Sequence, residues 1–401
     1  MKPYPAYKSS GIDWLPKIPS HWEMSKAKYY FRYTTGFTPP TGQDELYNEG
    51  ITWVTIADMN QKIVSDSVNT LAQLAIGRYK PDLTVKGSLL FSFKLSVGKV
   101  AFAGRDLYTN EAIISILPDE KYDVRYFYYT LPEQLLQNAN ENIYGAKMLN
   151  QELIRNASIC FPPLKDQMVI ANYLDKKTAQ IDNLIANKQK LIELLKEERM
   201  SVIDEAMDGK GRNWEKKKLK YIAKLRDEII DNADVKIAVE NIESGTGKLV
   251  NMGGERDYDG QLSAFKRGDT IFNKLRPYLH KVYFAEHNGG LFGELLIIYS
   301  TGELLPGFLF YKLFSKSFID IVDGSTQGTK MPRANWESFI CQLLISFPDD
   351  KKEQAIIVNH IQTETERIDD LICKIEKEIE LMQEYRTALI SEVVTGKIKI
   401  N

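Results

Sequence analysis

The sequence has no long apolar run, few cysteines and few histidines, and each shortage excludes a class of protein. The longest apolar stretches, such as residues 295–299, are far too short to cross a bilayer. The first ten residues lack the apolar segment of a signal peptide. We therefore expect a cytoplasmic protein.

The cysteines and histidines also argue against a metal site. Cys160, Cys341 and Cys373 and four histidines are scattered, and no pair has the spacing of a zinc site. An odd and sparse set of cysteines suits a reducing compartment. We expect no metal, and we expect each cysteine to pack as a small buried apolar group.

Neither sign of charge predominates, because the formal net charge of the 401 residues is −2. Residues 164–210 carry 8 Lys or Arg against 9 Asp or Glu, and residues 349–401 carry 8 against 12. The rest of the chain is therefore slightly basic, which points weakly toward nucleic acid. Hydrophobic residues make up 43%, enough for real cores, and the length suggests two to four domains.

The chain repeats itself at an offset that drifts from 181 to 187 residues, as small loop insertions would produce. Gln167 and Gln354 each open a long helical pattern, and each pattern follows a Phe-Pro element. Further matched blocks are residues 86–91 with 267–272, 99–103 with 281–285, Glu111 with Glu294, 145–148 with 328–331, Ile181-Asp182 with Ile368-Asp369, Arg199 with Arg386, and Gly209-Lys210 with Gly396-Lys397. Trp22-Glu23 and Trp214-Glu215, at a larger offset, are a candidate pair.

These blocks predict the order domain, helix, domain, helix, with boundaries at 1–163, 164–210, 211–348 and 349–401. A duplicated fold without functional meaning is the alternative interpretation.

Both helical segments combine charged outer faces with apolar residues seven apart, which is typical of a coiled coil. The predicted seam consists of Leu174, Ile181, Leu184, Leu195 and Val202 in the first segment and Ile361, Ile368, Ile375, Met382 and Leu389 in the second. The first pattern runs for about 40 residues, hence about 60 Å, which is too long for one small domain to cover. We predict that the two helices pair antiparallel, with a domain at each end; separate packing of each helix on its own domain is the alternative.

The two globular halves are expected to be mixed α/β, because short β-rich runs alternate with turn signals. The expected strands are 51–56, 89–93, 100–102 and 112–117 in the first half and 235–239, 270–272, 281–284 and 295–299 in the second; short helices are expected at 126–131 and 308–314. The fold class is thus α+β: two α/β domains joined by two long antiparallel coiled-coil helices, with a pseudo-two-fold internal repeat.

Basic residues gather near the predicted loops, beside aromatic or hydroxyl neighbours. Lys and Arg neutralise phosphates, and Arg, Asn and Gln can read base edges. The candidate DNA-binding residues are Thr38, Lys94, Ser96, Lys99, Tyr144, Lys147, Asn150, Lys274, Arg276, Tyr278, Lys281, Gln327, Thr329, Lys330 and Arg333. Lys99 recurs as Lys281 and Lys147 as Lys330, although such recurrence could equally preserve turns of the fold.

Motifs that carry chemistry are incomplete in this sequence, so we expect no catalytic residue. Residues 245–248, Gly-Thr-Gly-Lys, lack the earlier glycine of a phosphate loop, and Leu249 stands where Ser or Thr would bind magnesium. Residues 161–164 and 38–41 contain Pro-Pro without the Asn or Asp of amino-methylating DNA methyltransferases. Residues 348–351 resemble part of a nuclease carboxylate site but begin a helix, where Asp is a common cap.

Three segments resemble type I restriction–modification specificity subunits. The opening residues 10–15, Ser-Gly-Ile-Asp-Trp-Leu, with 18–23, Ile-Pro-Ser-His-Trp-Glu, resemble the start of such subunits. Residues 161–167, followed by Ile181-Asp182, resemble their central helical region, and residues 389–398 resemble their C-terminus. One departure is Phe347-Pro348-Asp349, where the second half lacks a second proline.

The resemblance implies two target recognition domains, each reading one half of a split, asymmetric DNA site, with the paired helices setting the spacing. It also implies two modification subunits that bind S-adenosylmethionine and methylate adenine, and a restriction subunit that uses ATP, with magnesium expected on the partners as well. None of these activities belongs to this chain. The alternatives are a stand-alone coiled-coil DNA-binding or scaffold protein and a self-contained nuclease or methyltransferase.

Overall fold

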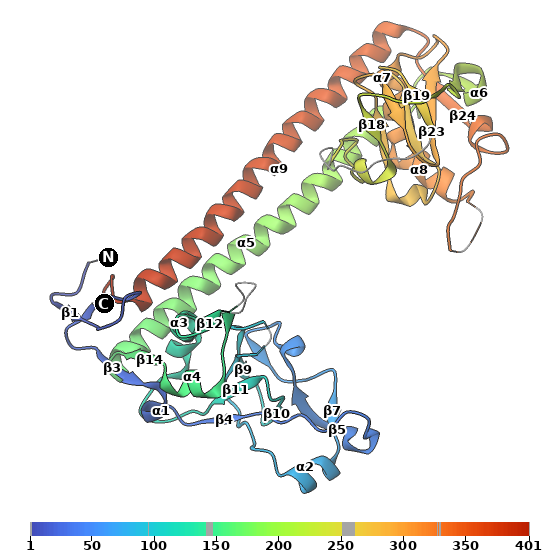
Figure 1. Ribbon diagram of the computed structural model, residues 1–401. Helices are drawn as coiled ribbons and strands as arrows, with labels where there is room; N and C mark the ends of the chain where they lie inside the picture. Colours follow the sequence, from blue (N-terminus) through green and yellow to red (C-terminus); the bar gives the residue numbers. More distant parts are fainter. Residues whose placement is uncertain are drawn as a thin grey trace. The chain divides into compact units, whose positions relative to one another are not determined.

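The computed structural model describes residues 2–94, 96–141, 147–250, 261–326, 328 and 330–400 (Figure 1). It contains two compact units, one made of Met1–Ile185 with Ile379–Asn401 (unit 1) and one made of Ala186–Glu378 (unit 2). Two helices of 44 residues, α5 (Leu164–Met207) and α9 (Lys351–Val394), each contribute to both units. In the described part of the chain, no helix combines the length and the apolar character that crossing a membrane requires.

The main sheet of unit 1 has five strands in the order β4-β11-β8-β9-β6. Their bounds are β4 (Tyr33–Thr35), β11 (Ile113–Ile116), β8 (Leu89–Ser92), β9 (Val100–Ala103) and β6 (Ile63–Val64). All neighbours are antiparallel except β6, which runs parallel to β9. β8 and β11 are buried at every position, so this sheet is covered on both faces.

Smaller elements complete unit 1. A three-stranded sheet has the order β10-β5-β7, and three two-stranded pairs are β1-β2, β3-β14 and β12-β13. The bounds are β1 (Tyr7–Ser9), β2 (Lys17–Pro19), β3 (Glu23–Lys26), β5 (Tyr47–Val54), β7 (Thr70–Leu71), β10 (Tyr108–Thr109), β12 (Asn140–Glu141), β13 (Lys147–Met148), β14 (Ser158–Phe161), α1 (Ala27–Tyr30), α2 (Gln73–Tyr79), α3 (Val124–Leu136), α4 (Gln151–Asn156), η1 (Asp44–Leu46) and η2 (Ile56–Asp58).

Unit 2 has a four-stranded sheet in the order β16-β23-β20-β21 and a second one in the order β17-β19-β22-β18, and β15 pairs with β24. The bounds are β15 (Glu215–Lys218), β16 (Ala223–Leu225), β17 (Ile229–Ile230), β18 (Lys236–Ile237), β19 (Leu262–Phe265), β20 (Thr270–Asn273), β21 (Val282–Phe284), β22 (Gly289–Leu291), β23 (Leu295–Ser300), β24 (Leu344–Phe347), α6 (Leu219–Ile222), α7 (Pro306–Phe314), α8 (Lys316–Asp323), η3 (Val239–Asn241), η4 (Pro277–Leu279) and η5 (Ile340–Gln342).

The two main sheets share one strand order, because β4-β11-β8-β9 corresponds to β16-β23-β20-β21. Six of the eight expected strands belong to these two sheets, with ends shifted by a few residues. The expected strand 51–56 is β5 of the three-stranded sheet, 235–239 is β18 of the second sheet of unit 2, and the expected helices are α3 and α7. The Phe-Pro elements, expected only as helix entries, are also strand ends: Phe161 ends β14 and Phe347 ends β24. The internal repeat is therefore a repeat of topology as well as of sequence.

Apolar residues of both long helices pack inside each unit. In unit 1, Leu174, Ile181 and Leu389 belong to the core, and in unit 2 Ile361 and Ile368 are fully buried. Val202 and Met382 are half-buried. The prediction for Leu184 is wrong, because its side chain is 51% exposed whereas its neighbour Ile185 is buried. A seven-residue spacing predicts an apolar stripe along the helix. Which side chains of the stripe are buried depends on where the partner helix packs against it.

Ion pairs show that the helices run antiparallel. Asp182 of α5 accepts from Arg386 of α9 at 2.8 Å in unit 1, and Arg199 of α5 donates to Asp369 of α9 at 3.0 Å in unit 2. Asp182 precedes Arg199 in α5, whereas its partner Arg386 follows Asp369 in α9, so the two helices run in opposite directions. Because Asp182 and Arg199 correspond to Asp369 and Arg386 in the repeat, the two pairs are reciprocal copies of one interaction. The predicted antiparallel pairing is confirmed.

A tryptophan in each unit joins the start of one long helix to the end of the other. Trp22 Nε1 donates to Asp166 near the start of α5, and the indole also contacts the turn at Gly396 that follows α9. In unit 2 the equivalent Trp214 donates to Glu353 near the start of α9 and packs on the glycine after α5. A Cβ on either glycine would lie within 3.1 Å of the indole, which explains why the repeat keeps glycine there.

The cysteine prediction holds for two of three residues. Cys160 and Cys341 are buried, but Cys373 is exposed. Cys373 lies two residues before the buried Ile375 on α9, and at 100° per residue that places it away from the packed face.

Candidate nucleic-acid interface

Two predicted loops of unit 2 are hydrogen-bonded to one another. The Ala334 amide donates to the Lys274 carbonyl at 2.9 Å, and the Arg276 amide donates to the Pro332 carbonyl at 2.8 Å. Leu275 and Arg333 form the bridge between these bonds. The loop that follows β20 and the loop that precedes η5 therefore form one surface.

Four predicted cations gather on this surface: Lys274, Arg276, Lys330 and Arg333. Arg276 adopts a left-handed backbone, with φ of 54°, and its Nη2 donates to the Lys330 carbonyl at 3.2 Å. Lys330 and Arg333 are exposed, and the other two side chains are half-buried. We call these four residues the unit 2 cation cluster.

Glu294, immediately before β23, is the carboxylate within the cluster. Arg333 donates from Nε to Oε2 at 2.8 Å and from Nη2 to Oε1 at 2.9 Å, a bidentate pair. These bonds, with the charge of nearby Lys274, hold the pKa of Glu294 below its usual range. The carboxylate therefore stays ionised and fixes the plane of the guanidinium.

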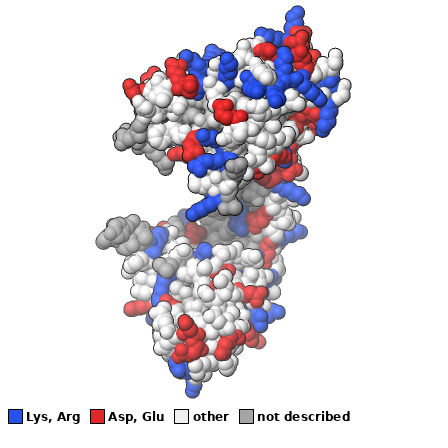
Figure 2. Space-filling model, turned by 90° about the vertical axis from the view of Figure 1, so that its right-hand side faces the viewer, with Lys and Arg blue, Asp and Glu red and all other residues white. Residues whose placement is uncertain are grey.

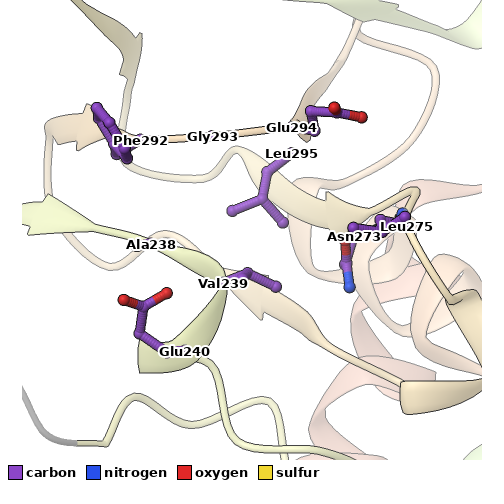
Figure 3. A pocket seen from close by; sticks show the side chains of 9 residues that line it. All are labelled: Ala238, Val239, Glu240, Asn273, Leu275, Phe292, Gly293, Glu294 and Leu295. Carbon is purple, nitrogen blue, oxygen red and sulfur yellow. Dashed lines mark hydrogen bonds between the residues drawn. The ribbon is translucent and has the colours of Figure 1, made fainter. Parts of the chain in front are cut away.

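A pocket of about 230 Å³ lies beside Glu294. It is lined by Ala238, Val239, Glu240, Asn273, Leu275, Phe292, Gly293, Glu294 and Leu295. In Figure 3 the side chains of Val239 and Leu295 point toward one another, and the carboxylate of Glu294 is turned away from them. The pocket is mostly apolar, so it offers room for a flat or methylated group next to the charged cluster.

The equivalent place in unit 1 holds a carboxylate with different donors. Glu111, just before β11, accepts a hydrogen bond from Thr38 Oγ1, and Lys94 Nζ lies 3.8 Å from its other oxygen. Burial raises the pKa of Glu111, but the Thr38 hydrogen bond and the Lys94 charge outweigh it and lower the pKa overall. Ser96 has a left-handed φ of 46°, as Arg276 does in unit 2. Thr38, Lys94 and Ser96 thus lie on the surface that corresponds to the cluster.

Lys99 and Lys281 have equivalent contacts that serve the fold. Lys281 Nζ donates to the carbonyl of Val239, the first residue of η3, at 2.8 Å. Lys99 Nζ lies 3.4 Å from the carbonyl of Ile56, the first residue of η2, and 3.3 Å from Asn60 Oδ1. Both ammonium groups hold a turn, so the recurrence of this lysine agrees with a turn that is repeated in the two halves of the chain.

The remaining predicted residues are spread more widely. Lys147 is exposed, and its Nζ lies 3.5 Å from the Leu136 carbonyl. Asn150 caps α4 by accepting from the Leu153 amide at 2.8 Å. Tyr278 is 56% exposed on η4. Tyr144, Gln327 and Thr329 lie outside the described residues.

A second basic surface was missed by the sequence reasoning. Lys216, Lys218, Lys220 and Lys224 have no carboxylate within ion-pair distance among the residues that the structure describes. Tyr221 beside them is 64% exposed, and Lys220 lies over its ring at 5.1 Å. Figure 2 shows more Lys and Arg on the visible face of unit 2, at the top of the view, than on unit 1. The run Lys216-Lys217-Lys218 was the available signal.

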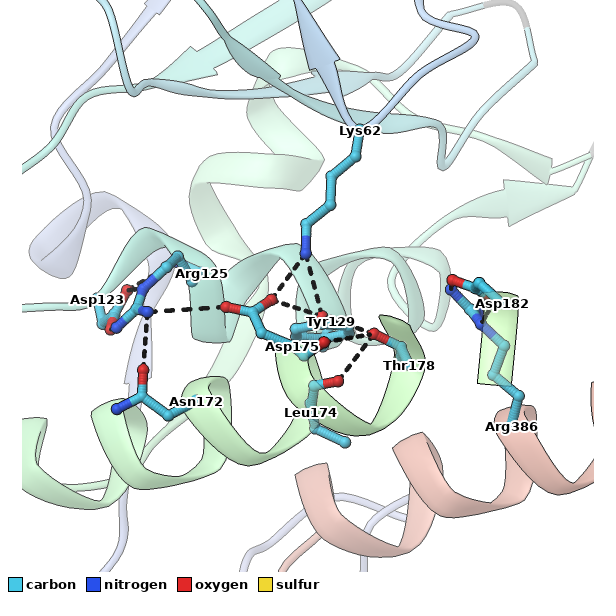
Figure 4. Close-up of polar contacts among 10 residues, drawn as sticks. All are labelled: Lys62, Asp123, Arg125, Tyr129, Asn172, Leu174, Asp175, Thr178, Asp182 and Arg386. Carbon is cyan, nitrogen blue, oxygen red and sulfur yellow. Dashed lines mark hydrogen bonds and ion pairs between the residues drawn. The ribbon is translucent and has the colours of Figure 1, made fainter. Parts of the chain in front are cut away.

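Each globular domain binds the long helices of its own unit through a charged contact. In unit 1, Asp175 of α5 accepts from Lys62 Nζ and from the Tyr129 hydroxyl, both at 2.7 Å, and lies 3.7 Å from Arg125 (Figure 4). Thr178, one turn later, lies 3.2 Å from the same hydroxyl.

In unit 2 the contact uses the Gly-Thr-Gly-Lys segment. Arg199 of α5 donates to the carbonyls of Gly245 and Thr246 at 3.3 and 3.0 Å, and Lys248 Nζ lies 2.9 Å from Asp369 of α9. Carbonyls of this loop face a cation, whereas a phosphate loop presents its amides to an anion. The Gly-Thr-Gly-Lys segment is therefore arranged to hold a cationic side chain, the opposite of what a phosphate loop does.

Both long helices also expose large apolar side chains. In unit 1 these include Leu184, Leu381 and Tyr385, and in unit 2 Leu191 and Leu194, each of these five between 43% and 55% exposed. Such residues on otherwise charged helices are typical of a surface that another protein covers.

Comparisons with known proteins agree with this geometry. Residues 19–196 match the family model of the type I restriction modification DNA specificity domain. The type I restriction enzyme MjaIX specificity subunit of Methanocaldococcus jannaschii is 22% identical, over 96% of this chain and 95% of the relative. The EcoDI specificity subunit of Escherichia coli is 25% identical, over 80% of this chain and 76% of the relative.

Two solved structures share the fold. A chain from a study of complex assembly and conformational transition of the type I R-M system has a TM-score of 0.73 at 11% identity, covering 95% of this chain and 99% of that one. The HsdS subunit of Thermoanaerobacter tengcongensis has a TM-score of 0.58 at 11% identity, covering 98% and 100%.

Proposed function

We propose that this chain, which belongs to the type I restriction–modification specificity subunits, reads a split, asymmetric DNA site with one half-site for each globular domain. The observation that carries the proposal is the repeated surface beside the main sheet, with Glu111 and Lys94 in unit 1 and Glu294 and Lys274 in unit 2. Two related but different surfaces on one chain suit a non-palindromic site, because an identical dimer would favour a palindrome.

The chain itself is a non-catalytic subunit, so the chemistry has to come from partners. Methylating a base requires flipping it out of the duplex, and the enzyme that does so must sit beside the reader. We therefore assign two modification subunits that bind S-adenosylmethionine and methylate N6 of adenine, and a restriction subunit that uses ATP and magnesium. A complex that acts on cellular DNA in this way is expected in the cytoplasm.

The exposed apolar residues of the helices are the proposed docking surface for the modification subunits. Tyr385→Asp would place a charge in that contact, so we expect co-purification of the modification subunit to fall about tenfold or more, as for a central interface residue. Glu380→Asp, on the same stretch of α9, keeps its charge and is the matched control. Full co-purification with Tyr385→Asp would contradict docking at this face.

Methylation mapping tests the reading function directly. The full chain is expressed with its modification subunit in a host without other adenine methylation, and N6-methyladenine is mapped across the genome. The expected result is one bipartite consensus with two different half-sites. Methylation without any sequence consensus, or a palindromic consensus, would sink the proposal.

The helices are proposed to set the spacer between half-sites. Deleting residues 186–192 and 375–381 removes one heptad from each helix while keeping the phase of both stripes. Each helix shortens by about 10 Å, which is about three base pairs of duplex. We expect the mapped spacer to shorten by about three base pairs. An active variant with an unchanged spacer would contradict this role.

A further inference from the structure

Arg333 is held so that one edge of its guanidinium is used and the other is free. Nε and one Nη2 hydrogen are directed at Glu294, at 2.8 and 2.9 Å. A guanidinium has five N–H donors, so three remain. Nη1 has no hydrogen-bond partner among the residues that the structure describes, and the side chain is 48% exposed. The free edge therefore presents two parallel donors, from Nη1 and Nη2.

The backbone that carries this arginine is also fixed. Leu275 and Arg333 form a bridge, flanked by hydrogen bonds of 2.8 and 2.9 Å between the two loops. Glu294 is placed by β23, whose first residue, Leu295, pairs with Asn273 of β20. Both the arginine and its carboxylate are therefore anchored to the main sheet. This anchoring reduces the conformational entropy that the side chains would lose on binding a ligand.

The charge balance favours a base edge over a phosphate as the target. Arg333 and Glu294 together form a neutral pair, so the pair has little net attraction for a phosphate. The donors of the free edge keep their direction, and two parallel donors match the O6 and N7 acceptors of guanine in the major groove. Phosphate neutralisation falls instead to cations of the cluster without a bound carboxylate, such as Lys330.

Unit 1 lacks this arrangement although it keeps the carboxylate. Glu111 is bound by Thr38 and lies near Lys94, and no arginine contacts it in the described residues. The corresponding position in unit 1 therefore offers a hydroxyl and an ammonium in place of a fixed planar fork.

We propose that Arg333, fixed by Glu294, is a specificity-determining residue that reads one guanine in the half-site bound by unit 2, and that unit 1 has no equivalent reader. This inference rests on the proposed function.

The experiment compares the full chain and its variants in complex with the modification subunit. Methylomes are mapped for the unaltered chain, for Arg333→Ala and for Arg333→Lys. The unaltered chain should require guanine at one position of one half-site. Both variants should relax that position, with discrimination falling about tenfold to a hundredfold, and leave the other half-site unchanged. Arg333→Lys keeps the charge and loses the fork, so it separates base reading from phosphate contact.

A base analogue gives the second measurement. Duplexes carrying 7-deazaguanine at the mapped position lack the N7 acceptor. The unaltered complex should bind them about tenfold more weakly than guanine duplexes, whereas Arg333→Ala should bind both equally. Glu294→Gln should give an intermediate loss. Glu337→Gln, at an exposed glutamate of the same unit outside the cluster, is the matched control and should leave the preference for guanine unchanged.

Several results overturn the inference while leaving the proposed function intact. One is an unchanged consensus with Arg333→Ala. Another is a loss of methylation that is equal at all sequences with Arg333→Ala and absent with Arg333→Lys, the signature of a phosphate contact. A third is equal sensitivity to 7-deazaguanine with and without the arginine. The absence of any bipartite consensus for the unaltered chain would instead overturn the proposed function.

Discussion

In unit 1 the globular domain binds α5 through Asp175, which accepts from Lys62 and Tyr129, whereas in unit 2 the domain binds through Arg199 and Asp369. The helix residues that pair the two helices, Asp182 with Arg386 and Arg199 with Asp369, are the same in both copies. Among the described residues, a loop of the domain contacts that ion pair in unit 2 and none does so in unit 1. The repeat has therefore kept helix pairing and a Tyr–Thr contact between domain and helix, Tyr129 with Thr178 and Tyr311 with Thr365, and has changed the charged contact beside it.

The same division holds at the start of each helix. Gln167 and Gln354 are both fully buried, and each donates to a proline carbonyl, at 2.8 and 2.9 Å. Each also accepts from the backbone amide of the residue that caps an earlier domain helix, Asp123 before α3 and Leu305 before α7. Groups that build the framework are thus retained, while groups on the surface proposed to read DNA, such as those around Glu111 and Glu294, differ. Under the proposed function, this division would let a half-site change without a change in the framework.

The largest expected effect tests whether the framework is equivalent in both copies. Trp22→Ala and Trp214→Ala each remove an indole that joins the two long helices, so each should cost about 3–5 kcal/mol of stability. Thermal unfolding with hydrogen exchange resolved to each unit measures the loss. Tyr29→Ala is the control, since Tyr29 is 76% exposed. A large loss for only one tryptophan would break the equivalence.

An intermediate effect is expected where the copies differ. Arg199→Ala removes bonds to Asp369 and to two loop carbonyls from a side chain that is 11% exposed, which should cost about 2–3 kcal/mol. Arg386→Ala removes a pair whose side chains are 33% and 52% exposed, which should cost less than about 1 kcal/mol. Melting temperatures of the two variants provide the comparison, and equal losses would show that the loop over Arg199 adds nothing.

The smallest effect concerns pH. His280 of unit 2 takes the place of Gly98 of unit 1, both with positive φ, and its ring lies 2.6 Å from the Phe314 carbonyl. Burial lowers the pKa of His280, only partly offset by this hydrogen bond. The unfolded chain therefore binds the proton more readily, and stability should fall as the pH drops below the ordinary histidine value of about 6.5.

Hydrogen exchange of the loop after β20, measured between pH 7.5 and 5.5, checks this prediction. The loop should become less protected at the lower pH, while the loop after β8 in unit 1 should not. His280→Gln should remove the difference. A loop after β20 that is equally protected at both pH values would contradict the assignment.

Much of the framework could be predicted from the sequence because it depends on repeated local patterns. The repeat predicted the order of domains and helices, and the heptads predicted the antiparallel pair that Asp182–Arg386 and Arg199–Asp369 demonstrate. The candidate DNA-binding residues stay a prediction, and the structure adds only where they lie. Lys274, Arg276, Lys330 and Arg333 do lie together, but Lys99 and Lys281 hold turns, and Asn150 caps a helix.

By itself, the sequence determined the duplication, the helical stripes and the strands of each domain, since these follow from periodicity and from residues that keep one role in both copies. Tertiary structure alone decided which edge of a stripe is covered, exposing Leu184 and burying Ile185, and which cations are free. The physical reason is that exposure and ion pairing depend on neighbours distant in the chain. Glu294, 39 residues from Arg333, is the partner that turns a surface arginine into a fixed pair of donors.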